Sequence, residues 1–454
     1  MGNIRFATLS LVIMLSVHAH ANIVGADTQN FNPTNDGLDF VTVHSSKTLT
    51  PGLMNFGFFL NYAVNSLPNY EDKTTQTRTN FRDALLSSDL NFAVGITRNW
   101  EAGLSLPMLL AQSVSSDLAT FRGQFASTGV TEYRAMTKYH IWGGADSGIA
   151  GVVSMNLNQI GDNPFAGTGA GPTYNFELAG DTMIGKFQWG INGGYRVRNP
   201  GRPIAGIPVE PFDDEYIAST ALSYLVTQWD TKIIGEIFGS VPTKTGQYIS
   251  DRAASSSELL LGMKTDLSES LAFHFGGGTQ IFQGTASPDW RVYTGINWVI
   301  GPLFSYPQEV IVRVDDQKLK ALDELNAVDP YANPPQITEA FIARDILFEF
   351  NSDQLKPAAE AKLQKLVNHL RRPPEFSKLT VEGHTDSIGN PNYNLDLSQR
   401  RANRVRQKLV SMGLAGTKVK AIGYGASQPI ANNGNFQGRA MNRRVEFKAE
   451  RQAQ

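Results

Sequence analysis

Between about Phe40 and Gly301, apolar and polar residues alternate with a period of two, in segments of roughly ten residues. In one such segment Trp189 and Ile191 lie on one face, and Gln188 lies on the other. This alternation is typical of β-strands that have one apolar and one polar face. Twelve segments follow it, starting near Leu53, Ala84, Glu101, Val130, Ser147, Pro172, Gly185, Glu215, Trp229, Ser257, Leu271 and Trp290.

The connections between these segments alternate between short and long. The short ones are predicted at 98–99, 144–146, 181–182, 228 and 268–270. An even number of strands, with tight turns on one side and long loops on the other, is typical of a transmembrane barrel whose short turns face the periplasm. A soluble sandwich also alternates, but the second face here is too polar for a sandwich core. We therefore predict an antiparallel transmembrane β-barrel of about 12 strands over residues 40–301.

The N-terminus has the pattern of a secretory signal over residues 1–21. Arg5 precedes the apolar run 6–17, and Ala19-His20-Ala21 fits a cleavage site. Residues 22–39 form an N-terminal extension without clear periodicity, and no function is predicted for it. No later apolar run reaches the ~20 residues of a spanning helix.

A proline-rich stretch over residues 302–336 is predicted to be a periplasmic linker, and it separates two regions of opposite charge. From Ile337 onward the chain has 19 Lys and Arg against 11 Asp and Glu, which leaves 21 against 31 in the rest. This asymmetry suggests two domains with different partners, although ordinary surface charge explains much of it. The chain has no cysteine, so disulfides, thiolate metal sites and a lipid-modified cysteine are excluded.

Residues 337–454 show alternating strand and helix signals, which predict an α/β domain with helices packed on one sheet. Asn394 is a candidate N-cap of the second helix, and Gly413 is its expected end. The strands are expected over 345–350, 379–383, 419–424 and 443–448, and the helices over 357–372 and 395–412.

Two arginines occupy positions in this domain where apolar residues are expected. Arg401 lies on the helix stripe of Leu397 and Val405, and Arg443 lies on the apolar face of the last strand. A buried arginine needs an anionic partner, and Asp386 is the nearest candidate. The cluster is either a structural ion-pair network or a site for a zwitterion, whose ammonium would bind Asp386 and whose carboxylate would bind Arg401.

The motifs around these residues closely resemble the OmpA-like peptidoglycan-binding domain, over about 110 residues. They are Gly383-His384-Thr385-Asp386-x-x-Gly389, Tyr393-Asn394-x-x-Leu397-Ser398-x-x-Arg401-Ala402-x-x-Val405, Gly423-Tyr424-Gly425, Pro429, Arg439 and Asn442-Arg443-Arg444-Val445-Glu446. The resemblance implies that Asp386 and Arg401 hold the diaminopimelate of the wall's stem peptide. It further implicates Thr385, Asn394, Asn442 and Arg443 as supporting residues.

The chain is therefore expected to be an OmpA family outer-membrane protein. Its barrel would contact outer-membrane lipid, and its C-terminal domain would lie in the periplasm and tether the membrane to peptidoglycan. The alternative is a narrow porin in which the C-terminal domain is a secondary anchor. A catalytic pair or a metal-ligand spacing is not apparent, so we predict no enzyme activity, no cofactor and no metal site. Nucleic acid is not an expected partner, since basic and aromatic residues are not interleaved.

Overall fold

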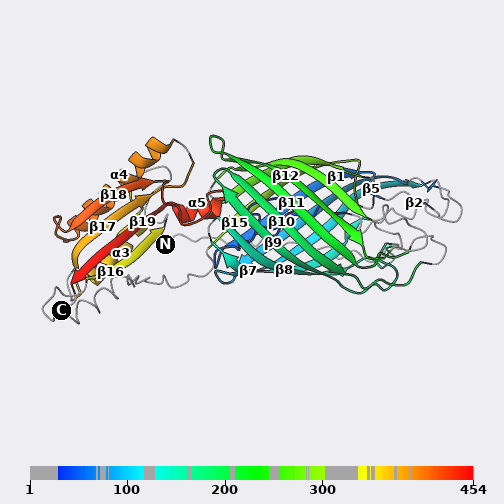
Figure 1. Ribbon diagram of the computed structural model, residues 1–454, viewed down its shortest axis with the longest axis horizontal. Coiled ribbons are helices and arrows are strands. Elements are labelled where there is room, and N and C mark those ends of the chain that lie inside the picture. Colours follow the sequence, from blue (N-terminus) through cyan, green and yellow to red (C-terminus); the bar gives the residue numbers. More distant parts are fainter. Residues whose placement is uncertain are drawn as a thin grey trace, which may run out of the picture.

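The computed structural model consists of a β-barrel and a smaller α/β domain next to one end of it (Figure 1). The expected signal (1–21) and nearly all of the expected linker lie outside the described residues. The structure describes residues 29–67, 70–71, 78–79, 81–116, 128–301 and 336–452, except for 145, 162, 164, 205–209, 245–254, 269, 283, 285, 345–347, 349–352, 373–375 and 389.

The N-terminal part is a closed antiparallel barrel, which confirms the predicted fold. In the described part of the chain its wall has twelve long strands, each starting within three residues of its predicted start. Strand β1 pairs with β15 from Met54↔Ile300 to Val64↔Trp290, and this pairing closes the barrel. The strands are β1 (Met54–Val64), β4 (Phe81–Gly95), β5 (Trp100–Ser116), β7 (Glu132–Gly143), β8 (Ser147–Asn158), β9 (Thr173–Ile184), β10 (Phe187–Val197), β11 (Glu215–Val226), β12 (Thr231–Pro242), β13 (Ser256–Asp266), β14 (Leu271–Gln280) and β15 (Trp290–Ile300).

Short turns join the strands at one end of the barrel, which we call the short-turn end. The turn predicted at Asp181–Thr182 is wrong, because β9 continues to Ile184 and the chain reverses at 185–186. Gly185 has a φ of +64°, in the left-handed region that a two-residue hairpin turn requires. The long connections contain three short strands, β2 (Tyr70–Glu71), β3 (Arg78–Thr79) and β6 (Gly129–Val130).

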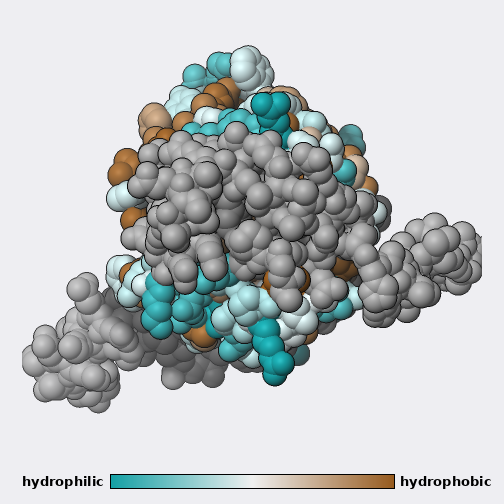
Figure 2. All heavy atoms as spheres, turned by 90° about the vertical axis from the view of Figure 1, so that its right-hand side faces the viewer, coloured by the Kyte–Doolittle hydropathy of each residue, from teal (hydrophilic) through white to brown (hydrophobic). Residues whose placement is uncertain are grey.

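The outer face of the barrel is apolar. Large side chains such as Trp189, Leu222 and Trp298 are each at least 50% exposed. Viewed from the end that carries the long loops, apolar side chains gather along the flank of the barrel (Figure 2). Soluble monomers rarely expose apolar patches of this extent, whereas lipid-facing strand positions require them.

The polar inner face of the barrel is covered by residues 29–50, which we call the inner segment. Glu236 of β12 accepts a hydrogen bond from the backbone N–H of Val41 at 2.6 Å. Glu101 of β5 accepts one from the N–H of Leu49 at 2.7 Å. Strands β5 and β12 are far apart in the strand order of the wall, so one short segment reaches both only from inside the barrel.

Apolar packing also holds the inner segment in place. Phe31, Phe40, Val41 and Val43 form a buried cluster with Phe59 and further residues of the wall. Burying such side chains stabilises the segment by about 1.5–3 kcal/mol each. The inner segment is therefore a packed element of the barrel and not a loose tail.

The C-terminal domain has a four-stranded sheet in the order β16-β19-β17-β18. Its strands are β16 (Gln336–Arg344), β17 (Phe376–His384), β18 (Val419–Gly425) and β19 (Arg444–Gln452), and its helices are α3 (Pro357–Leu370), α4 (Pro391–Ser411) and α5 (Phe436–Asn442). Strands β17 and β18 are parallel, and the other neighbours are antiparallel. Leu363, Val367, Leu379, Val405 and Phe447 belong to a core drawn only from this domain.

Several expected elements differ in detail from the observed ones. The strand expected over 345–350 lies mostly outside the described residues, and Phe348 makes an isolated bridge to Leu355. Asn394 is not the N-cap of α4: Asn390 takes that place, with Pro391 at the first helical position. Helix α4 ends before Gly413, whose φ is +95°, as predicted. Among the described residues, no helix is both long and apolar enough to cross a membrane.

Candidate functional site

The loop after β17 carries Asp386, and hydrogen bonds fix its conformation. The Thr385 N–H donates to the carbonyl of Gly425 at 3.0 Å, and the Thr385 hydroxyl donates to the carbonyl of Asp386 at 2.9 Å. Oδ1 of Asp386 accepts from the N–H of Ile388 at 3.0 Å. One carboxylate oxygen of Asp386 is thus committed to the loop, and the other is directed to a different partner.

That partner is Arg443, whose Nη1 donates to Oδ2 of Asp386 at 2.7 Å. Arg443 was predicted on the last strand, but it lies just before β19, at the C-terminal end of α5. The two side chains are 15% and 12% exposed. They are therefore partly desolvated, which strengthens their attraction, yet a small ligand can still reach them.

Two asparagines shape the surroundings of this ion pair. Nδ2 of Asn394 donates to the carbonyls of Asp386 and Ile388, at 3.3 and 2.9 Å. Oδ1 of Asn442 accepts from the N–H groups of Ile430 and Ala431, at 2.8 and 2.9 Å. Both side-chain amides form hydrogen bonds with backbone groups, so these two asparagines hold the surrounding loops in position.

Arg401 enters from α4 and is buried, 6% exposed. It shares the buried face of α4 with Leu397 and Val405, as its place on the stripe predicts. Its guanidinium lies over the ring of Phe348, 5.1 Å from the ring centroid, in the geometry of a cation–π contact. The ion pair that the structure gives Asp386 is the one with Arg443.

A second group of residues at this end of the domain was not predicted. Arg439 of α5 is 3.1 Å from Oδ1 of Asp230 in the β11–β12 turn, and it also donates to Asp266 at the end of β13. Asn435, the N-cap of α5, donates from Nδ2 to Oδ1 of Asp39 at 3.1 Å. Arg439 is part of the quoted motif, but its partners are more than 150 residues away in sequence, so spacing gives no signal for them.

The contact with the barrel brings Asp230 close to the candidate site. Burial raises the pKa of the Asp230 carboxyl, and Arg439 lowers it in part. The charges of Asp386 and Arg443 also act on that pKa. The Asp386–Arg443 pair and the short-turn end of the barrel are therefore electrostatically coupled.

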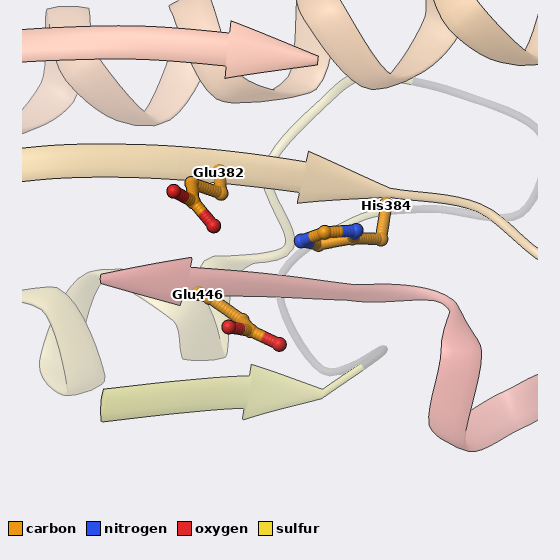
Figure 3. A group of neighbouring side chains, drawn as sticks. All are labelled: Glu382, His384 and Glu446. Atoms are coloured by element: carbon orange, nitrogen blue, oxygen red, sulfur yellow. The ribbon is translucent and has the colours of Figure 1, made fainter. Parts of the chain in front are cut away.

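His384 lies beside Glu382 and Glu446 on the sheet, a grouping of the ligand types that bind divalent metals (Figure 3). Both carboxylates already have cationic partners, because Lys448 donates to Glu382 at 2.6 Å and Arg444 donates to Glu446 at 2.7 Å. Burial, reinforced by Arg444, lowers the pKa of His384 to about 4. The His384 imidazole is therefore neutral at neutral pH, and it lies between two carboxylates that are each paired with a cation.

A profile of the OmpA family matches residues 347–443. The chain is 43% identical over 121 residues to "Outer membrane porin F" of Pseudomonas aeruginosa, covering 26% of this chain and 34% of that protein. It is 28% identical over 290 residues to "Outer membrane protein A" of Shigella flexneri, covering 61% of this chain and 74% of that protein. The chain thus spans about a third of the length of the porin F relatives. The solved peptidoglycan-associated lipoprotein from Burkholderia pseudomallei is 30% identical, covers 24% of this chain and 90% of that chain, and has a TM-score of 0.22.

Proposed function

Because the chain is an outer-membrane protein whose C-terminal domain belongs to the OmpA family, we propose that it tethers the outer membrane to the cell wall. The C-terminal domain, which we call the wall domain, binds the diaminopimelate of peptidoglycan stem peptides without a covalent bond. The protein acts by binding, needs no cofactor, and has outer-membrane lipid and peptidoglycan as its partners. The partly exposed Asp386–Arg443 ion pair is the observation that carries this proposal.

The charges of the site match a zwitterion. Asp386 supplies one negative charge, and Arg401 and Arg443 supply two positive charges. The ammonium of a diaminopimelate side chain replaces Arg443 on Asp386, and the guanidinium groups then hold the carboxylate. Each charged group keeps a partner in the bound state, which a partly desolvated site requires.

The position of the domain suits this role. It lies at the short-turn end of the barrel, where Arg439 contacts Asp230, and short turns face the periplasm in outer-membrane barrels. A single contact of this size is weak and reversible. Many copies acting on one wall give a strong attachment through avidity.

Sedimentation of the full-length protein with purified peptidoglycan sacculi, in detergent, tests the proposal. We expect Asp386→Ala and Arg401→Ala to abolish cosedimentation, and free diaminopimelate to compete with the wall for the wild type. Arg404→Ala is the matched control, because Arg404 is on the same helix, is half exposed and pairs with Asp353 at 3.5 Å. If Arg404→Ala and Arg401→Ala lose binding equally, the site assignment is wrong.

The porin alternative receives less support. It requires the charged residues of the inner face to meet solute, and two of them, Glu101 and Glu236, instead bind the inner segment. A barrel with its inner segment in place is not a plain open pore.

A further inference from the structure

We propose that the barrel is a gated channel, in which residues 29–50 are the plug and α5 of the wall domain retains the plug from the periplasmic side. The proposal depends on contacts inside the barrel and does not depend on the ligand of the wall domain.

The inner segment extends along the barrel interior. Near its start, Gln29 accepts hydrogen bonds from Asn61 at 3.1 Å and from Ser87 at 2.9 Å. Near its end, Lys47 donates to the carbonyl of Gly144, in the β7–β8 turn, at 2.7 Å. The inner segment therefore extends from a level within strands β1 and β4 to the short-turn end of the barrel. It occupies the path that a solute would take.

Charge pairs join the inner segment to the wall. Lys138, which is fully buried, pairs with Asp36. Lys232 donates to Oδ1 of Asp39 at 3.1 Å. Water solvates the charged groups of these pairs well. If the inner segment leaves the wall and water fills the lumen, each of these groups therefore keeps a hydrogen-bonding partner. The charged part of the attachment is therefore compatible with opening, and the apolar cluster of Phe31, Phe40, Val41 and Val43 keeps the plug closed most of the time.

The wall domain contacts the plug at the residue that pairs with Lys232. Asn435 donates to the same Oδ1 of Asp39, at 3.1 Å. The neighbouring Gly434 approaches the barrel so closely that a Cβ there would lie 3.2 Å from Oε1 of Gln188 and 3.3 Å from Nζ of Lys232. The loop before α5 thus enters the mouth of the barrel and blocks the exit of the plug.

The wall domain is held in this position by Arg439. It is 2% exposed and binds two carboxylates of the barrel, Asp230 at 3.1 Å and Asp266. Hydrogen bonds between charged groups are stronger than those between neutral groups. Loss of this contact frees the loop, and the plug then loses its support at Asp39.

Single-channel recording of the full-length protein in planar bilayers tests the gate. We expect the wild type to be closed most of the time. Asn435→Asp keeps an acceptor for the N-cap of α5 but places a second carboxylate against Asp39, so the open fraction should rise about tenfold. Asn403→Asp is the matched control, since it makes the same change of charge at an exposed position of α4.

A reversible cross-link tests the plug itself, and the chain has no other cysteine to interfere. A Cβ on Gly148 would lie 2.6 Å from Oγ of Ser46, so Ser46→Cys with Gly148→Cys puts the two Cβ atoms within about 4 Å, as a disulfide requires. The oxidised protein should be silent, and reduction should restore wild-type openings. Ile191→Cys with Thr220→Cys, opposite each other on β10 and β11, is the control pair away from the plug.

Two results overturn the proposal. If the oxidised Ser46–Gly148 variant conducts as well as its reduced form, the current does not pass where residues 29–50 lie. If Asn435→Asp opens no more often than Asn403→Asp, or if every variant is silent, α5 does not control a gate.

Discussion

Nη1 of Arg443 lies 2.7 Å from Oδ2 of Asp386, although the two residues are 57 positions apart in sequence. In this state the Arg443 guanidinium is bound to the Asp386 carboxylate, which is the group that binds the ammonium of the proposed ligand. Ligand binding is therefore an exchange of ion pairs, and its strength depends on the charge of Asp386 more than on its shape.

Asp386→Asn separates charge from shape, because the amide oxygen can still accept from the N–H of Ile388. We expect the full-length variant to bind sacculi at least about tenfold more weakly, since it loses a charge-assisted hydrogen bond. Cosedimentation at a series of sacculus concentrations measures the change. Asp396→Asn, on an exposed part of α4 where Asp396 pairs with Arg400 at 2.9 Å, should bind as the wild type does.

The buried imidazole of His384 makes the wall domain sensitive to acid. Burial lowers the pKa of His384 to about 4, while the unfolded chain has the ordinary value of about 6.5. Between these two values the unfolded state binds more protons, so stability falls as the pH decreases from about 6.5 to about 4 and changes no further below that.

Urea denaturation of a fragment spanning residues 337–454 measures this effect, because the domain has a core of its own. We expect the wild type to lose about 2 kcal/mol more than His384→Phe between pH 7 and pH 4.5. Phenylalanine keeps the stacking on Tyr424, whose ring centroid is 5.4 Å away. Carboxylates titrate equally in both proteins, and parallel pH profiles would show that His384 is not the group responsible.

The inner segment should stabilise the barrel as well as fill it. Glu236 accepts from the N–H of Val41 at 2.6 Å and from the hydroxyl of Thr42 at 2.6 Å. Glu236→Ala leaves the buried N–H of Val41 and the partly buried hydroxyl of Thr42 without this acceptor, and an unsatisfied buried donor costs about 1–3 kcal/mol. We expect the heat-dependent shift in gel mobility of this variant to occur at a clearly lower temperature than that of the wild type. Asp146→Asn, in an exposed turn, is the control, and equal shifts would contradict a structural role for the segment.

The barrel is predictable because its signal is local. Each strand alternates along its own length, so Trp189 and Gln188 reveal their faces without knowledge of their neighbours. Boundaries are less local: the true reversal at Gly185 depends on a left-handed turn, and the start of α4 depends on Pro391 and Asn390. Patterns alone therefore identified the barrel strands, but they misplaced one turn and one helix cap and did not predict β16.

The rest depends on distant partners. Residues 29–39 have no periodicity, and residues 40–50 were predicted as part of the barrel region although they form no strand. The conformation of both follows the charges of the surrounding wall, such as Glu236 and Lys232. The burial of Arg401 was predictable from its helix stripe. The contact of Arg439 with Asp230 joins two domains, and the sequence pattern of each domain is consistent by itself. Neither pattern therefore predicts the contact between them.

The two proposals together predict that wall binding opens the channel. Oδ1 of Asn433 accepts from the N–H of Ser387, beside Asp386, at 3.2 Å, and its carbonyl accepts from Arg439 at 3.1 Å. A ligand that displaces the loop of Asp386 therefore disturbs the contact that retains α5 on the barrel, and linkage requires each event to favour the other.

Soluble peptidoglycan fragments added on the side of the wall domain should raise the open fraction of the wild type and leave Asp386→Asn unchanged. If the fragments bind but do not open the channel, the coupling is absent while the wall site stands. If they fail to bind, the site assignment fails, and the disulfide experiment on Ser46 and Gly148 still decides the plug independently.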